Sequence, residues 1–430
     1  MLLVLLLLCA LFSWLTVADQ FPSGEEAAAQ VARQIADLNR PAARVVIAVR
    51  DQREDHAFAD ALRARLQAAG AAIVADVRGG PPDVRRELKH LASRGERIDA
   101  IAASSASSRW WVLSEAASEF PQLGDPVLVR PYPYRWPNFL KPENLLNVAN
   151  QIAVIAIVAV GMTVVIITGG IDLSVGSLIA LSAVASTLLI RDVGGAAAAD
   201  PLSMTLCCAA GILLSGAIGA FSGAMVTLFG VPPFIVTLGM MLFASGLAFI
   251  LSRGESVYQV PDSFVWLGRG ADLAGIPNAV VLMLLLYVVA HVLMSRTAWG
   301  RYVYAVGGNV EAARLSGVPV RRVISTAYVL CGMLAGLGGV VMASQLKSGS
   351  PTYGQMYELY VIAAVVVGGT SLSGGEGKVF GTLVGALIIA VIQNGMNLMD
   401  VESYTQKVVL GLVILGAVLL DRLKHGRQWT

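Results

Sequence analysis

The sequence has few charged residues for its length. Only 14% of its 430 side chains are Asp, Glu, Lys or Arg, whereas soluble domains carry about 25%. Of these 60 charges, 34 lie within residues 19–144, and the other 304 positions hold 26. This shortage excludes a single soluble enzyme. The uneven distribution indicates that residues 19–144 lie in water and that most of the rest lies in lipid.

Paired cysteines, a strong net charge and a phosphate-binding loop are also missing. The four cysteines lie in apolar runs, so they suggest neither a disulfide framework nor a metal site. A net charge of +2 gives no sign of a nucleic-acid partner. No Gly-x4-Gly-Lys-Ser/Thr loop is present; at Lys378 the sixth position before it is Leu372 and the next residue is Val379. We therefore expect no cofactor, no metal and no catalysis by the chain itself.

Long apolar runs fill the charge-poor part. A helix needs roughly 20 mostly apolar residues to cross a bilayer, and about ten stretches approach this requirement. They are 1–18, 147–168, 173–190, 202–229, 232–252, 276–296, 322–343, 357–370, 378–398 and 404–421. The sequence therefore predicts an all-α polytopic membrane protein with about ten transmembrane helices. Because no basic residue precedes the first run, we favour an uncleaved span over a signal peptide, although Thr16-Val17-Ala18 fits a cleavage site.

Basic residues in the short loops predict the orientation, because Lys and Arg collect on the cytoplasmic side. The loops on one side, with the tail after the last span, hold nine of them, five in the loop around 297–322. The loops on the other side hold four. We therefore expect a multi-pass protein of the plasma (inner) membrane with both termini, including a tail at 426–430, in the cytoplasm. Residues 19–144 would then be extracytoplasmic.

Residues 43–130 alternate between strands and helices, so a small inserted α/β domain is predicted over 19–135. The expected strands are Arg44–Val49, Ala72–Val77, Ile98–Ala103 and Pro126–Val129. The expected helices are Asp55–Ala69, which ends at Gly70, then Asp83–Ser93 and Trp110–Phe120. Short connections between alternating strands and helices indicate a parallel sheet covered by helices. This pattern resembles one lobe of the periplasmic sugar-binding proteins. Ligand binding, docking of another protein and a spacer role all remain open.

Two polar stretches interrupt the apolar background with related sequences. The first, 168–177, contains Gly-Gly-Ile-Asp-Leu-Ser-Val-Gly, and the second, 368–378, contains Gly-Gly-Thr-Ser-Leu-Ser-Gly-Gly. Such internal repetition is common in transporters built from two related halves. Ionisable groups inside a membrane are functional candidates, so Asp172 and Ser174 become candidates for a translocation pathway. The alternative is that they cap the next helix.

A third stretch, 300–319, predicts a compact element on the cytoplasmic face. Asn309 is a suitable N-cap for a short helix over Val310–Ser316, and Gly317 is a suitable residue to end it. A short helix with a signal at each end indicates a defined contact surface. The alternative is a basic loop among lipid headgroups.

Together these stretches resemble the permease subunit of ABC importers of the ribose and monosaccharide class, which includes autoinducer-2 importers. The resemblance extends over 1–18 and about 136–425, and Asp172 falls on the family's Gly-Gly-Ile-Asp-Leu-Ser motif. It implies that the loop 297–322 contains a coupling helix that docks on an ATP-binding subunit. The residues implied in this contact are Gly308, Asn309, Glu311, Ala312, Ala313, Arg314 and Gly317. The insertion at 19–135 departs from the family pattern.

We therefore predict a permease subunit without enzymatic activity, embedded in membrane lipid. It would form a pathway for a sugar or similar small polar solute with a second copy or a related permease. Separate ATP-binding subunits would energise it, and a periplasmic solute-binding protein is a further implied partner. Further pathway candidates are Gln151, Asn394 and Asn397, which could instead form hydrogen bonds between helices. The alternative function is a secondary transporter driven by an ion gradient, for which Asp172 is the clearest intramembrane carboxylate.

Overall fold

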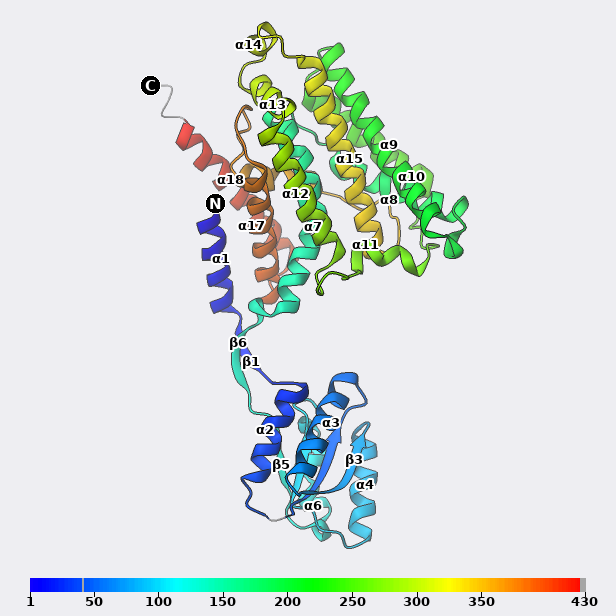
Figure 1. The fold of residues 1–430 in the computed structure, drawn as a ribbon, viewed down its shortest axis with the longest axis vertical. Coiled ribbons are helices and arrows are strands. Elements are labelled where there is room, and N and C mark those ends of the chain that lie inside the picture. The colour runs from blue at the N-terminus through cyan, green and yellow to red at the C-terminus, as the bar shows by residue number, and fades with distance from the viewer. Residues whose placement is uncertain (41, 426–430) are drawn as a thin grey trace. The chain divides into compact units, whose positions relative to one another are not determined.

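The computed structural model describes residues 1–40 and 42–425, and the chain divides into two compact units. The first, here called the membrane unit, holds Met1–Thr16 and Asn138–Thr430. The second, called the α/β unit, holds Val17–Pro137. Figure 1 colours the chain from blue to red in sequence order. The expected tail at 426–430 lies outside the described residues.

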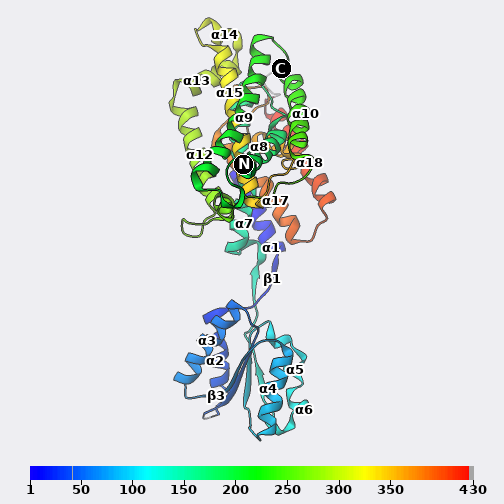
Figure 2. The same ribbon diagram turned by 90° about the vertical axis from the view of Figure 1, so that its right-hand side faces the viewer.

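The α/β unit is built on a four-stranded parallel sheet. Its strands are β2 (Arg44–Val49), β3 (Ala72–Arg78), β4 (Ala100–Ala103) and β5 (Val127–Val129), in the order β3-β2-β4-β5. Successive strand residues point to opposite faces. Val45 and Ile47 therefore pack against α2 (Gly24–Ala36) and α3 (Arg53–Ala68), while Val46 packs against α4 (Pro81–Ser93). Figure 2 shows these helices on the two sides of the sheet.

The prediction of a third helix over Trp110–Phe120 is wrong, because this segment does not form a single helix. The structure has two short helices instead, α5 (Trp111–Ser114) and α6 (Ala116–Glu119), separated at Glu115. The Ser114 hydroxyl donates to the Trp111 carbonyl, and the Ser118 hydroxyl donates to the Glu115 carbonyl. Such local hydrogen bonds compete with the regular helical pattern.

A two-stranded ribbon joins the two ends of the α/β unit. β1 (Val17–Gln20) pairs antiparallel with β6 (Tyr134–Pro137), with Gln20 opposite Tyr134. In the membrane unit, the Asn138 N–H donates to the Thr16 carbonyl over 2.9 Å. The chain therefore leaves and re-enters the membrane unit at neighbouring residues.

The membrane unit consists of helices. Seven are long and apolar enough to cross a membrane: α7 (Pro142–Ile167), α8 (Val175–Asp192), α9 (Pro201–Leu228), α10 (Pro233–Ser252), α12 (Asn278–Arg296), α15 (Val320–Leu346) and α17 (Val379–Leu398). Three further helices are α1 (Leu2–Leu15), α16 (Tyr357–Val367) and α18 (Ser403–His425), whose apolar parts are shorter. The short helices are α11 (Trp266–Arg269), α13 (Ala298–Gly308) and α14 (Val310–Leu315).

The expected span at 357–370 is shorter than predicted. α16 has 11 residues, and at 1.5 Å per residue it extends about 16 Å, whereas the hydrocarbon core is about 30 Å thick. The segment before it, 347–356, contains no helix. α16 alone is therefore too short to span the hydrocarbon core.

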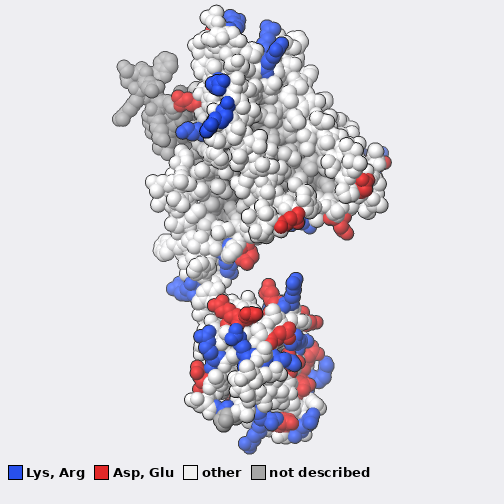
Figure 3. All heavy atoms as spheres, in the orientation of Figure 1, with Lys and Arg blue, Asp and Glu red and all other residues white. Residues whose placement is uncertain are grey.

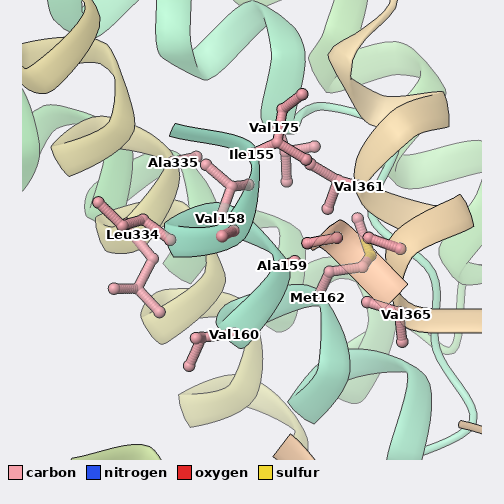
Figure 4. Close-up of a cluster of buried hydrophobic side chains, with 14 of the residues drawn as sticks. Ile155, Val158, Ala159, Val160, Met162, Val175, Leu334, Ala335, Val361 and Val365 are labelled. Carbon is pink, nitrogen blue, oxygen red and sulfur yellow. The ribbon is translucent and has the colours of Figure 1, made fainter. Parts of the chain in front are cut away.

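α7 occupies the centre of the membrane unit. Figure 4 shows its side chains between α15, which contributes Leu334 and Ala335, and α16, which contributes Val361 and Val365. α9 and α15 approach closely at Gly219, which has no side chain; a Cβ atom there would overlap the Tyr328 carbonyl. Small residues that allow close approach are typical of helix packing in membranes.

Candidate functional site

The three polar stretches noted in the sequence meet at one place, here called the glycine junction and defined by Ile167, Gly307 and Gly375. The Gly375 N–H donates to the Ile167 carbonyl over 2.9 Å. Gly307, in α13, lies against both residues, and a Cβ atom there would overlap the Ile167 carbonyl oxygen. The Tyr304 hydroxyl of α13 also donates to the Gly377 carbonyl over 2.8 Å. α13 is therefore joined to both repeated motifs through the backbone.

The repeated motifs also begin with the same local structure. After α7, the Gly169 N–H donates to Ile166 and the Gly170 N–H to Val165. After α16, Gly369 and Thr370 donate in the same pattern to Val366 and Val365. Gly169 and Gly369 both have positive φ, at 80° and 91°. These are two Schellman motifs, which require a left-handed residue after the helix end.

The predicted short helix in the 297–322 loop is present as α14. The Asn309 side chain accepts the Ala312 N–H over 2.9 Å, and Gly317 follows with a φ of +81°. Ala313 is buried against the membrane unit. Leu315 is 85% exposed, and the exposed Glu311 and Arg314 form an ion pair of 2.7 Å. Figure 3 shows Lys and Arg side chains gathered over α13, α14 and the start of α15.

Asp172 is fully buried between α7 and α8. Its Oδ1 atom accepts the Ser174 N–H over 2.9 Å and the Ser174 hydroxyl over 2.6 Å. The Cys331 thiol lies next to the carboxyl group. Ser174 is the N-cap residue of α8, but its side chain makes no capping hydrogen bond. The capping alternative is therefore wrong for Ser174, because its hydroxyl is bonded to Asp172 instead.

The amide candidates lie farther along the bundle. Asn394 and Asn144 form a reciprocal pair, with amide-to-oxygen distances of 3.0 and 2.9 Å. Asn397 accepts the Gln406 amide over 2.7 Å. Asn394 and Asn397 thus form hydrogen bonds between helices, which was the alternative to a role in the pathway. Gln151 is exposed and borders a small cavity beside Tyr357.

One acidic side chain was missed at the sequence level. Glu358, in the first turn of α16, borders a cavity of about 320 Å³ with residues of α8 and α10. Its position at the start of the apolar run 357–370 could have identified it. α13 was also missed, because glycines stand at both ends of 300–308. The cavity holds none of the pathway residues predicted from the sequence.

Residues 144–418 match the family described as branched-chain amino acid transport system / permease component. This match covers more than half of the chain and leaves the α/β unit outside it. No solved structure matches the chain.

Several known permeases are similar over most of their length. The ribose import permease protein RbsC of Escherichia coli (strain K12) is 45% identical over 294 residues, which is 67% of this chain and 88% of the relative. RbsC of Bacillus subtilis (strain 168) is 44% identical over 291 residues, 67% of this chain and 87% of the relative. The D-allose transport system permease protein AlsC of Escherichia coli (strain K12) is 37% identical over 285 residues, 66% and 85% of the two chains. These relatives are transport subunits, and the chain belongs to this family of ABC importer permeases of the ribose and monosaccharide type.

Proposed function

We propose that this chain forms the translocation pathway of an ABC importer for a monosaccharide or similar small polar solute. A second copy, or a related permease, would complete the pathway. The similarity to ribose and allose permeases over the membrane unit supports the solute class. Exposed apolar side chains on α9 and α10, such as Phe221 and Leu242, provide surface for lipid or for the second permease.

The observation that carries the proposal is the backbone connection between α14 and the glycine junction. α14 presents Leu315 and the ion pair of Glu311 and Arg314 to the outside. α13 precedes it directly and lies against Ile167 and Gly375. An ATP-binding subunit that moved α14 would therefore act on the ends of α7 and α16 together. Coupling would be a population shift between two pathway states carried by rigid helices.

We further propose that the end of the membrane unit carrying α13 and α14 faces the cytoplasm. The basic loop 297–322 belongs to this end, and the positive-inside rule favours it. The chain would then begin and end in the cytoplasm and cross the membrane about ten times. Residues 17–137 would be extracytoplasmic, and a periplasmic solute-binding protein would have to dock beside them.

The candidates Asp172, Ser174, Gln151, Asn394 and Asn397 remain predictions for the pathway. Asp172 and Ser174 are buried and bonded to each other. We propose that they act on the pathway indirectly, by holding the first turn of α8 in place. Gln151, which is exposed, is the amide most available to a passing solute.

The test is uptake of radiolabelled ribose, allose and arabinose into cells that produce this chain with its neighbouring ATP-binding subunit. Uptake should require a catalytically competent ATP-binding subunit. If uptake persists with a catalytically dead subunit and stops with a protonophore, the ion-gradient alternative holds and the ABC mechanism is wrong.

A further inference from the structure

A cavity with a mixed lining lies between α8, α10 and the start of α16, and apolar residues such as Ala180, Met241 and Met356 form part of its wall. Its volume is about 320 Å³, at the lower end of the range of about 300–1,000 Å³ for small-molecule sites. Ser177 of α8, Ser245 of α10, and Gln355 and Glu358 bring polar side chains to its wall. The segment 347–356, which is not helical, forms another part of the wall.

The cavity lies well inside the thickness of the helical bundle. Tyr357, next to Glu358, shares a small second cavity with Ile152 of α7 and Ala390 of α17. Ile152 is ten residues from the start of α7, so it lies about 15 Å from that end. Ala390 is eleven residues from the start of α17, which begins at the opposite end, so it lies about 16 Å from there. Glu358 is therefore far from both ends of the bundle.

The segment before α16, which forms one side of this cavity, is unsuited to lipid. Gly354 and Met356 have positive φ, at 69° and 66°, so the backbone here departs from a helix. The side chains of Thr352 and Gln355 are exposed. At membrane depth, irregular backbone occurs where it is buried in protein or lines water, and ionisable side chains such as Glu358 face the bundle interior or a watery cavity. The cavity therefore opens toward water or toward a second permease.

Gly176 makes room for the carboxyl group. A Cβ atom at Gly176 would overlap Oε2 of Glu358 and the Gly354 carbonyl. Gly176 is the last glycine of the first repeated motif, Gly-Gly-Ile-Asp-Leu-Ser-Val-Gly. This motif therefore contributes both to the glycine junction, through Gly169 near Gly374, and to the cavity.

We propose that this cavity is a solute subsite of the translocation pathway, in which Glu358 accepts hydrogen bonds from hydroxyl groups of a neutral monosaccharide. A carboxylate offers acceptors alone, whereas Ser177, Ser245 and Gln355 can both donate and accept. A polyol needs such a mixture. The negative charge would also repel anionic solutes such as sugar phosphates. This inference rests on the proposed function as a monosaccharide permease.

The first test measures ribose transport by the reconstituted complex of the full chain with its ATP-binding subunit. Glu358→Ala should raise KM about 10- to 100-fold, because hydrogen bonds to a charged acceptor are strong. Glu358→Gln should have a smaller effect, and ATP hydrolysis without solute should remain. Glu402→Ala, at an exposed position before α18, is the control. An unchanged KM for Glu358→Ala would overturn the proposal.

The second test separates failure of this inference from failure of the proposed function. Ser245→Cys is introduced where Cys9, Cys207 and Cys208 are alanine, and Cys331 is kept because its side chain is 0% exposed. A charged thiol reagent should label Ser245→Cys, and ribose should slow the labelling. Leu285→Cys, on the exposed apolar face of α12, should stay unlabelled.

If Ser245→Cys is not labelled, or if ribose gives no protection, the cavity is not a ribose subsite. If wild-type complex imports none of the sugars while labelling is normal and ribose protects, the proposed function alone fails.

Discussion

Among the described residues, eight Arg–carboxylate ion pairs and two His–carboxylate contacts join side chains of the α/β unit, whereas three ion pairs lie in the larger membrane unit. The glycines of the two units differ in their surroundings, and here the tight contacts are in the membrane unit. Gly70 and Gly95 of the α/β unit have positive φ and open space around them, as turn residues do. Gly219, Gly307 and Gly385 of the membrane unit lie against backbone, where a Cβ atom would overlap.

The difference follows from the surroundings of each unit. In water, burial of apolar side chains stabilises the sheet and its helices, and charged side chains remain at the surface. In lipid, the tails are as apolar as the helices, so close packing and hydrogen bonds must hold the helices together. Substitutions that add volume should therefore damage the membrane unit most, while changes of charge should affect the α/β unit most.

The largest effect is expected for Gly307→Leu. The new side chain has no room beside the Ile167 carbonyl and Gly375, so α13 must separate from both repeated motifs. Overpacking costs about 1–3 kcal/mol or more. We expect ribose uptake to be lost and the thermal midpoint of the purified chain to fall. Gly411→Ala, in α18 with open space around it, should change neither. A wild-type midpoint for Gly307→Leu would show that the glycine junction is not tightly packed.

A smaller effect, confined to coupling, is expected for Gly317→Val. Gly317 has a φ of +81°, which is strained for a β-branched residue by about 1–2 kcal/mol. The end of α14 should change shape while the spans stay intact. Uptake should fall about tenfold or more, with a normal amount of chain in the membrane. Ser316→Ala in the same turn is the matched control. Normal uptake by Gly317→Val would count against a coupling role for α14.

A pH effect is expected in the α/β unit. The Arg44 backbone N–H, at 2.8 Å, and the Arg40 guanidinium lower the pKa of Asp99, while its partial burial opposes them. This ionised carboxylate therefore stabilises the folded unit above its unfolded pKa of about 4. That contribution is lost as the pH falls through the lower folded pKa.

Hydrogen exchange of residues 17–137 in the full chain would measure this effect. Asp99→Asn should lower the protection at pH 7 by up to about 1 kcal/mol, because the side chain is partly exposed. The variant and the wild type should converge at low pH. Asp125→Asn, at an exposed position, serves as the control. Equal protection of Asp99→Asn and wild type at pH 7 would contradict the role of Asp99.

The smallest effect on the membrane unit is expected when the α/β unit is removed. Gln20 and Tyr134 are paired across the ribbon, so residues 21–133 can be replaced by the two-residue turn Asn-Gly. The thermal midpoint of the membrane unit should stay within error of the wild type. A collapse of expression would show that the two units are not independent in stability. Retained or lost ribose uptake would then report whether the α/β unit assists transport.

Much of the architecture could be predicted from local patterns. Apolar length identified the long helices, and strand alternation identified β2 to β5 close to their observed bounds. Asn309 and Gly317 identified α14, because capping depends on neighbouring backbone groups alone. α2 could also have been found, since Ala27, Val31 and Ile35 repeat at helical spacing and are buried.

Other features depend on side-chain contacts that apolar length and helix propensity do not reveal. The break within 111–119 arose from serine hydrogen bonds that compete with the helix, which propensity alone does not predict. The choice between the two roles left open for Asn394 needed its pairing with Asn144, which lies 250 positions away in the sequence. Glu358 became a candidate site residue only because α16 is short and its first turn contacts Gly176.

The sequence by itself determined that one part of the chain is suited to water and the other to lipid, and that two Gly-Gly motifs repeat. It also determined the caps of α14. Composition and short-range hydrogen bonding control these features, so they can be seen in one window of residues. Only the tertiary structure decided that both motifs meet α13 at the glycine junction and that Glu358 borders a cavity. Those arrangements depend on backbone contacts between distant segments, which local patterns do not encode.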